Sequence, residues 1–344
     1  ISVQLSGVDY DSILERVANE DTEAARRTLL RDMLFGQLGV TEEQALIGSA
    51  RIDTIWRGSK RTIDVVYGNI RNRDEMTDSV LRADGERWRL IVDFPFDSDG
   101  HGPQDDISRI DTLRHDGLQS RTVAWVPSFL TTARLDDLGK LVRLNYLIRG
   151  DGQRLAEHSA HLPPEQRPMA KSHLESLRGA LTNKLTEVLK QAYGVAKRES
   201  VDIDMTYGDV PPFATLDPDF LPQRAIGADL GQAMTNLADQ MLSSQYPDHP
   251  RFEPGSTEVR RADVGVVVDF VSQAMQREGR VDAVDSAKRG VLRRVANPLR
   301  CGQMHENHFV FGAQSFPWRN DFVRWSARDN LTGQVPVRRI REWL

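Results

Sequence analysis

The stretch RLIVDFPFDSDGHGPQDD, residues 89–106, joins a short apolar run directly to a group of aspartates. Leu90, Ile91 and Val92 have the residue types of a buried strand, and Asp93 stands at its end. Five aspartates fall within fourteen residues, together with two glycines and a proline that favour a turn. Three interpretations follow: a metal site, the acidic strand end of an ATPase, or a solvated turn.

A strand ending in aspartate has the shape of a Walker B segment, whose carboxylate holds Mg²⁺ beside the phosphates. Such a strand needs a phosphate loop, and the pattern G-x-x-x-x-G-K-[ST] does not occur in the chain. Phe94, not a catalytic glutamate, follows Asp93, and Pro95 and Phe96 stand where an EF-hand needs ligands. We therefore expect a structural or docking turn, in which aspartates accept hydrogen bonds from backbone amides beside the glycines. We assign no catalytic residue and no metal ligand here.

The alternative interpretation is an enzyme, namely a metal-dependent nuclease or phosphatase that uses the Asp93–Asp106 cluster. Asp93, Asp97 and Asp99 would be its metal ligands. A nuclease would also need an E-x-K strand after Asp64 or Asp93, and none follows. The sequence therefore does not predict a self-contained enzyme.

The composition predicts a globular protein of two or three domains, with 344 residues of which 28% are charged. Residues 1–50 hold nine acids against four arginines, whereas residues 281–300 hold five basic residues against two acids, which indicates different partners at the two ends. The single cysteine, Cys301, excludes an internal disulfide and favours a reducing cytoplasm. No apolar run approaches the roughly 18 residues of a membrane span, so we expect no membrane partner. Because the chain starts at Ile1 and stops after RRIREWL, we expect a segment of a larger protein.

We predict an α+β fold that is mainly helical and has several domains. Residues 9–39 read as helical, with Asp21 as a helix cap. The segments IDTIW and TIDVVYGNI, joined by RGSK, predict a hairpin, and RWRLIVDFPF and RTVAWVPSF predict two further strands. A small β-sheet is therefore inserted among helices at about 51–130.

A helical body is predicted from residue 135 to about 242. Its best segment, MAKSHLESLRGALTNKLTEVLKQAYG, keeps apolar residues at i, i+3 and i+4 and ends at Gly194, where a glycine following a helix belongs. The prolines of PDHPRFEPG indicate a linker. The predicted domains are residues 1–134, 135–246 and 256–344, with the linker at 247–255.

The last domain is predicted to contain a winged-helix-like module. ADVGVVVDFVSQAMQ forms one helix, GR a turn and SAKRGVLRRVANPL a second helix, and CGQMHE and HFVFG are short extended segments. Basic side chains of the second helix would contact the phosphates of double-stranded DNA, although docking to a protein or simple solvation remains open. These predicted nucleic-acid-binding residues are Lys288, Arg289, Arg293 and Arg294. Cys301, His305 and His308 have the types of zinc ligands, but a fourth ligand is missing, and we expect a solvated wing.

The order of several segments resembles a middle portion of the PglY/BrxC-like phage-resistance ATPases of phage growth limitation and BREX defence. The segments are TIWRGSKRTIDVVYGNIR, WRLIVDFPFDSDGHGPQDDISRI, WVPSFLTTARLDDLGKLVRLNYLI, LKQAYG and ANPLRCGQMHENHFVF. The resemblance implies a phosphate-loop module nearer the N-terminus of the full-length protein, which would bind ATP and Mg²⁺, and no cofactor in this chain. It implies PglZ-like and PglX-like methyltransferase proteins as partners. The chain would be a cytoplasmic DNA- and partner-engaging module; a winged-helix regulator is the alternative that rests on the last domain alone.

Overall fold

The computed structural model describes residues 10–40, 45–46, 49–97, 100–150, 152–252, 257–312 and 316–343. The chain forms two compact units. Unit 1 comprises Ile1–Thr54 and Thr62–Gln245, and unit 2 comprises Ile55–Arg61 and Tyr246–Leu344. The predicted combination of helices with a small sheet is confirmed: about half of the described residues are helical, and they hold a mixed sheet and a second, smaller sheet.

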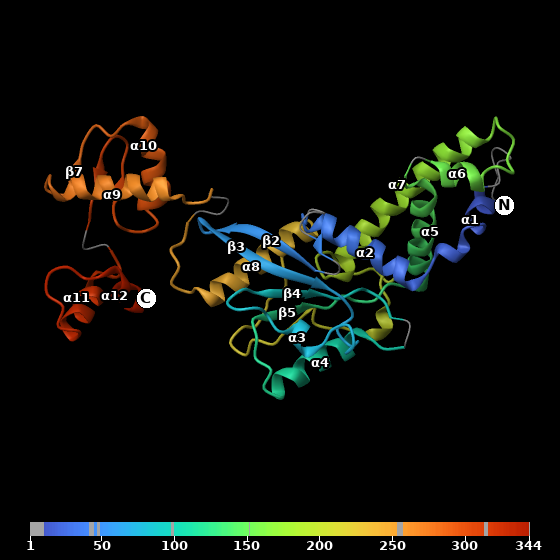
Figure 1. Ribbon diagram of the computed structural model, residues 1–344, viewed down its shortest axis with the longest axis horizontal. Helices are drawn as coiled ribbons and strands as arrows, with labels where there is room; N and C mark the ends of the chain where they lie inside the picture. Colours follow the sequence, from blue (N-terminus) through green and yellow to red (C-terminus); the bar gives the residue numbers. More distant parts are fainter. Residues whose placement is uncertain are drawn as a thin grey trace. The chain divides into compact units, whose positions relative to one another are not determined.

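Unit 1 is built on a sheet in which strands β1 to β6 lie side by side in chain order (Figure 1). The strands β3, β4 and β5 are parallel, and β6 is antiparallel to β5. The strands are β1 (Ala45–Leu46), β2 (Ser49–Trp56), β3 (Ser59–Tyr67), β4 (Arg89–Val92), β5 (Thr122–Trp125) and β6 (Phe213–Thr215). All four predicted strands, β2 to β5, are confirmed. The sequence did not predict that three of them, β3, β4 and β5, run parallel.

The hairpin between β2 and β3 turns at two residues with left-handed backbone conformations. Arg57 has φ 44° and Gly58 has φ 73°, and two successive positive values give the turn that matches the twist of paired strands. The tip of this hairpin contacts the segment predicted as a linker. The ring of His249 lies 4.7 Å from that of Trp56, and the amide of Val259 donates to the carbonyl of Gly58 over 2.8 Å.

Parallel strands require crossover segments, and two helices provide them here. Helix α3 (Asp78–Leu81) connects β3 to β4, and α4 (Pro103–His115) connects β4 to β5. The predicted turn at the aspartates is therefore wrong from residue 103 onward, because Pro103 occupies the first position of a helix. Every residue of β5 is buried, and an apolar core packs between the strands and α4; it includes Ile91, Ile107, Ile110, Ala124 and Leu216.

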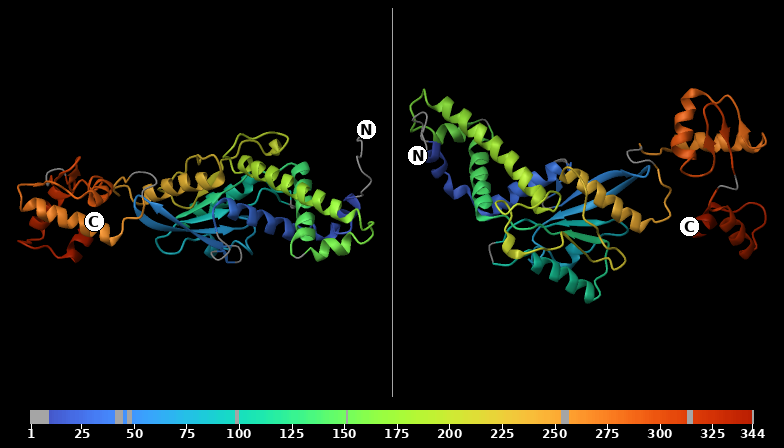
Figure 2. Two further views of the ribbon diagram at one scale, coloured as in Figure 1. Left: turned by 90° about the horizontal axis from the view of Figure 1, so that it is seen from above. Right: turned by 180° about the vertical axis from the view of Figure 1, so that it is seen from behind.

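Figures 1 and 2 show α5, α6 and α7 grouped with α1 at one end of the sheet. The unit 1 helices besides α3 and α4 are α1 (Tyr10–Glu15), α2 (Glu23–Gln37), α5 (Thr132–Ile148), α6 (Gln153–His158), α7 (Arg167–Ala192) and α8 (Leu230–Gln245). Helix α7 confirms the predicted amphipathic segment, and Gly194 follows it with φ 73°. Thr22, not Asp21, caps α2, because its hydroxyl accepts from the amide of Ala25.

The predicted helical body is interrupted between α7 and α8, where β6 joins the sheet beside β5. Unit 2 contains a three-stranded antiparallel sheet in the order β7-β9-β8. Its elements are α9 (Arg261–Met275), β7 (Arg280–Val281), α10 (Ser286–Val291) with a π-helical continuation (Leu292–Ala296), β8 (Gln303–Met304), β9 (Phe309–Val310), α11 (Arg319–Arg328) and α12 (Val337–Trp343). Among the described residues, no helix combines the length and apolar character needed to cross a membrane.

Candidate functional site

The carboxyl ends of β3 and β4 bring five polar side chains together in unit 1. We call them the carboxyl-edge cluster: Tyr67, Arg71, Asp93, Asp97 and Asp106. Tyr67 ends β3, Asp93 directly follows β4, and Asp106 comes from the first turn of α4. This edge of a parallel sheet is where open α/β folds bind ligands, so the cluster is the first place to look for a function.

Arg71 is the cation of the carboxyl-edge cluster, and it forms ion pairs with two carboxylates. Its Nε lies 2.9 Å from Oδ1 of Asp106, and its guanidinium also contacts Asp97. The side-chain amide of Asn69 donates to Asp97 over 3.4 Å. Arg71 is not among the site residues predicted from the sequence, although its position just after a predicted strand is a usable signal.

Asp93 and Asp106 are almost completely buried, with 2% and 1% of their surface exposed. The Oδ2 atom of each has no hydrogen-bond donor among the described residues. Burial and the charge of Asp106 raise the pKa of Asp93 well above its usual value. Burial also raises the pKa of Asp106 to about 6, against the opposing effect of Arg71. If Asp93 holds a proton, its neutral carboxyl group donates a hydrogen bond to the carboxylate of Asp106, which supplies the donor that the buried carboxylate oxygens otherwise lack.

Further hydrogen bonds join the aspartates of this region to the backbone. Asp93 accepts from the amide of Phe94 over 2.8 Å, and its carbonyl accepts from the hydroxyl of Tyr193. Asp105 accepts from the amide of Gly102 over 2.8 Å, which confirms the predicted capping by an aspartate beside a glycine. The described residues contain no group of three His, Cys, Asp or Glu side chains that could hold a metal ion, and Asp99 lies outside them.

The N-terminus of α4, at the same edge of the sheet, carries two carboxylates. A nucleotide phosphate needs free backbone amides and positive charge at a helix N-terminus. At the N-terminus of α4 the amide of Gly102 is already bound by Asp105, and Asp106 adds a second carboxylate in the same turn. Two negative charges at this position repel a phosphate group.

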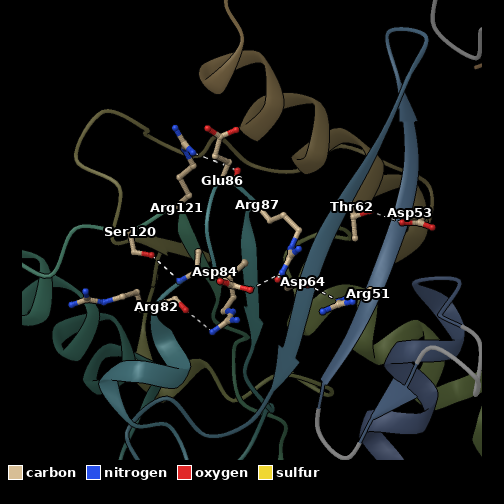
Figure 3. A network of polar contacts seen from close by, with 12 residues as sticks. Arg51, Asp53, Thr62, Asp64, Arg82, Asp84, Glu86, Arg87, Ser120 and Arg121 are labelled. Carbon is tan, nitrogen blue, oxygen red and sulfur yellow. Dashed lines mark hydrogen bonds and ion pairs between the residues drawn. The ribbon is translucent and has the colours of Figure 1, made fainter. Parts of the chain in front are cut away.

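Asp64, which lies within β3, is level with the amino end of β4, whereas Asp93 follows the carboxyl end of β4. In the β3–β4 register Asp64 pairs with Arg89, the first residue of β4. Figure 3 shows the polar network there: the carboxylate of Asp64 lies 3.1 Å from Arg87 and 3.3 Å from Arg51. The structure therefore does not combine Asp64 and Asp93 into one site.

The four basic residues predicted to bind nucleic acid have different surroundings in unit 2. Lys288 and Arg293 are exposed, whereas Arg289 and Arg294 are half-buried. Arg289 donates to the carbonyl of Val284 over 2.8 Å, and Arg293 donates to a carbonyl in the β8–β9 turn over 3.0 Å. Arg294 is 3.0 Å from a carboxylate oxygen of α9 and also contacts the chain just before that helix.

The residues weighed as zinc ligands do not gather into a site. The rings of His305 and His308 stack with their centroids 4.7 Å apart in the β8–β9 turn. The thiol of Cys301 is half-buried against the carbonyl of Ala296, and burial raises its pKa. A thiol held in its neutral form is a poor metal ligand.

The local sites do not identify the class of protein, but comparison with known protein families does. Residues 13–246 match the fourth domain of PglY, and residues 262–344 match the fifth domain of the BREX system ATPase PglY. No solved structure gives a significant match. These domains define the class of protein as a component of a BREX system, with a role in bacterial anti-phage defence. Because the fourth-domain match alone covers most of the chain, the chain belongs to the PglY family, and its partners are other BREX proteins.

Proposed function

We propose that this chain is the part of a PglY ATPase that engages double-stranded DNA and other BREX proteins. In this proposal residues 261–310, the α9–β9 module, are a winged helix. The observation that carries the proposal is the order α9-β7-α10-β8-β9 together with the sheet order β7-β9-β8. A strand between two helices, followed by a hairpin that pairs with it, is the arrangement of winged helices. In helix-turn-helix proteins the second helix enters the major groove.

The charges of this region support contact with phosphates. Residues 246–344 contain sixteen Lys and Arg against twelve Asp and Glu, although the whole chain has a net charge of −5. Lys288 and Arg293 are exposed on α10 and its continuation, and Arg289 lies between them in the chain. We assign phosphate contacts to these three residues. Arg294 positions α9 through its ion pair with Asp263 and has less freedom to reach DNA.

Salt-dependent duplex binding by the full 344-residue chain tests this proposal. Each phosphate contact contributes roughly one unit to the slope of log affinity against log salt concentration. The double variant Lys288→Gln/Arg293→Gln should therefore lower this slope by about two, with an affinity loss that is the same for unrelated sequences. A matched control is Arg261→Gln/Arg277→Gln, which removes the same charge from exposed positions at the two ends of α9.

The proposal fails if the unmodified chain does not bind duplex at low salt, or if both double variants lower the slope equally. The second result would mean that only net charge matters. Far-ultraviolet circular dichroism checks that the variants fold, and exposed charges should contribute little to stability.

In this proposal, another part of the full-length cytoplasmic protein binds ATP and Mg²⁺. The partners of this chain are PglZ-like and PglX-like proteins. The absence of a phosphate loop from the sequence supports that division. The enzyme alternative has less support, because its candidate ligand Asp93 is 2% exposed and its neighbour Asp106 is 1% exposed. A regulator made of the winged helix alone leaves the fourth-domain match without a role.

A further inference from the structure

Helices α11 and α12 form a small helical pair after the α9–β9 module, drawn in red in Figure 1. Asp329, at the end of α11, connects the two helices. Its carboxylate accepts from Arg328 over 3.0 Å, from Arg339 over 2.9 Å and from the indole nitrogen of Trp343 over 2.9 Å. These hydrogen bonds, of which that from Arg328 has the largest effect, lower the pKa of Asp329 to about 2. The carboxylate that connects the two helices is therefore charged at neutral pH.

The pair carries a cluster of aromatic rings. Neighbouring ring centroids lie between 5.8 Å and 6.5 Å apart. No described residue from 316 to 343 is buried, so each ring keeps part of its surface open to solvent. We call this set the aromatic surface: Phe316, Trp318, Phe322, Trp325 and Trp343.

Positive charge surrounds the aromatic surface. Residues 316–343 contain six arginines and three acids. The three acids form ion pairs with arginines of the same two helices, and the surplus of arginines leaves a net positive charge. The side chain of Arg338 is 91% exposed, that of Arg324 is 71% exposed, and Arg341 is also exposed.

We propose that the aromatic surface and its arginines bind single-stranded nucleic acid. Open aromatic rings stack with unpaired bases, and arginines neutralise the backbone phosphates and stack on bases as well. A duplex hides its base faces, so this ligand is distinct from the duplex assigned to α10. The ligand could in principle be a nucleic acid or the apolar surface of another protein. The surplus of arginines favours the nucleic acid, because it is a polyanion and also presents flat rings for stacking. The inference goes beyond the proposed function and does not depend on it.

Tryptophan fluorescence of the full chain gives a direct test. Three of the six tryptophans belong to the aromatic surface. The other three are buried, with Trp88 and Trp125 1% exposed and Trp56 5% exposed. Oligothymidylate and oligouridylate of about ten nucleotides are the probes, since single-strand sites usually cover about 4–16 nucleotides. Saturable quenching by these strands, much weaker with a duplex of equal length, is expected; the two strands show whether DNA or RNA is preferred.

Two variants separate binding from folding. Arg338→Gln/Arg341→Gln should weaken binding of the single strand about ten-fold and lower its salt slope by about 1.4 units, since each contact to a single strand contributes about 0.7. Trp325→Leu keeps an apolar side chain but removes a stacking face, so it should also weaken binding about ten-fold. If Trp325→Leu unfolds the helical pair, the arginine variant, which changes only exposed side chains, decides alone.

The control variant Lys288→Gln/Arg293→Gln, which changes the proposed duplex site, should leave quenching by single strands unchanged. Failure of one nucleic-acid site can therefore be told apart from failure of the other. Equal quenching by duplex and single strands would overturn the inference. So would an unchanged emission at low salt, which is the result expected if the aromatic surface docks on a protein instead.

Discussion

Replacing Asp93 by asparagine should make unit 1 more stable at neutral pH. In the wild type, folding buries Asp93 beside Asp106 and requires one shared proton. The amide of asparagine has nearly the shape of a protonated carboxyl group and can donate the same hydrogen bond to Asp106 without taking up a proton. The variant therefore keeps the contact and removes the cost of protonation.

The size of the effect follows from the pKa difference between the folded and unfolded states. Burial raises the pKa of Asp106 from 3.8 to about 6, and that of Asp93 is raised in the same direction. Between these values the folded state holds a proton that the unfolded state releases, so stability decreases as the pH rises from about 4 to about 6. Roughly two pH units at about 1.4 kcal/mol each amount to ~3 kcal/mol. That is the cost of ionising the buried Asp106. The raised pKa of Asp93 adds a cost of the same sign, and Asp93→Asn should remove that second cost, so that stability at pH 7 rises and its dependence on pH flattens.

The stability of unit 1 is measured by urea unfolding at pH 4.5, 6 and 7.5. Hydrogen exchange of peptides from β4 and β5 reports on unit 1 separately from unit 2. Asp111→Asn is a matched control, because Asp111 lies on the same helix as Asp106 with a side chain 47% exposed. A loss of stability in Asp93→Asn at pH 7.5, or an unchanged pH slope, would refute the shared proton.

Two glycine substitutions test the packing. Gly302→Ala places a Cβ 2.1 Å from the ring of Phe309, in the core of unit 2, and should destabilise that unit by at least about 2 kcal/mol in thermal unfolding. Gly139→Ala brings a Cβ within 2.1 Å of Asp21 and should cost about 1–2 kcal/mol despite the better helix propensity of alanine. The control Gly179→Ala, with no atom within 4 Å, should instead stabilise α7 by about 0.5–1 kcal/mol; equal effects at Gly139 and Gly179 would contradict the close approach.

The sequence by itself determined the elements whose signals are local. The alternation and β-branched residues of β2 and β3 predicted strands, and the RGSK turn predicted their hairpin. The 3.6-residue period of α7 and Gly194 after it predicted a helix and its end. Lys288 and its neighbours could be selected because charge is visible in sequence, although the pairing of Arg294 with Asp263 was not.

Tertiary structure decided everything that depends on distant partners. β6 is only three residues long and becomes a strand because it pairs with β5. The crossover through α4 carries Asp106 to the end of β4, thirteen residues after Asp93, and so turns an apparently solvated aspartate into a buried one. The protonation of Asp93 follows from that burial and from the neighbouring charge of Asp106. A sequence pattern specifies which side chains are present, but the dielectric environment and the charges around a carboxyl group exist only once the chain has folded.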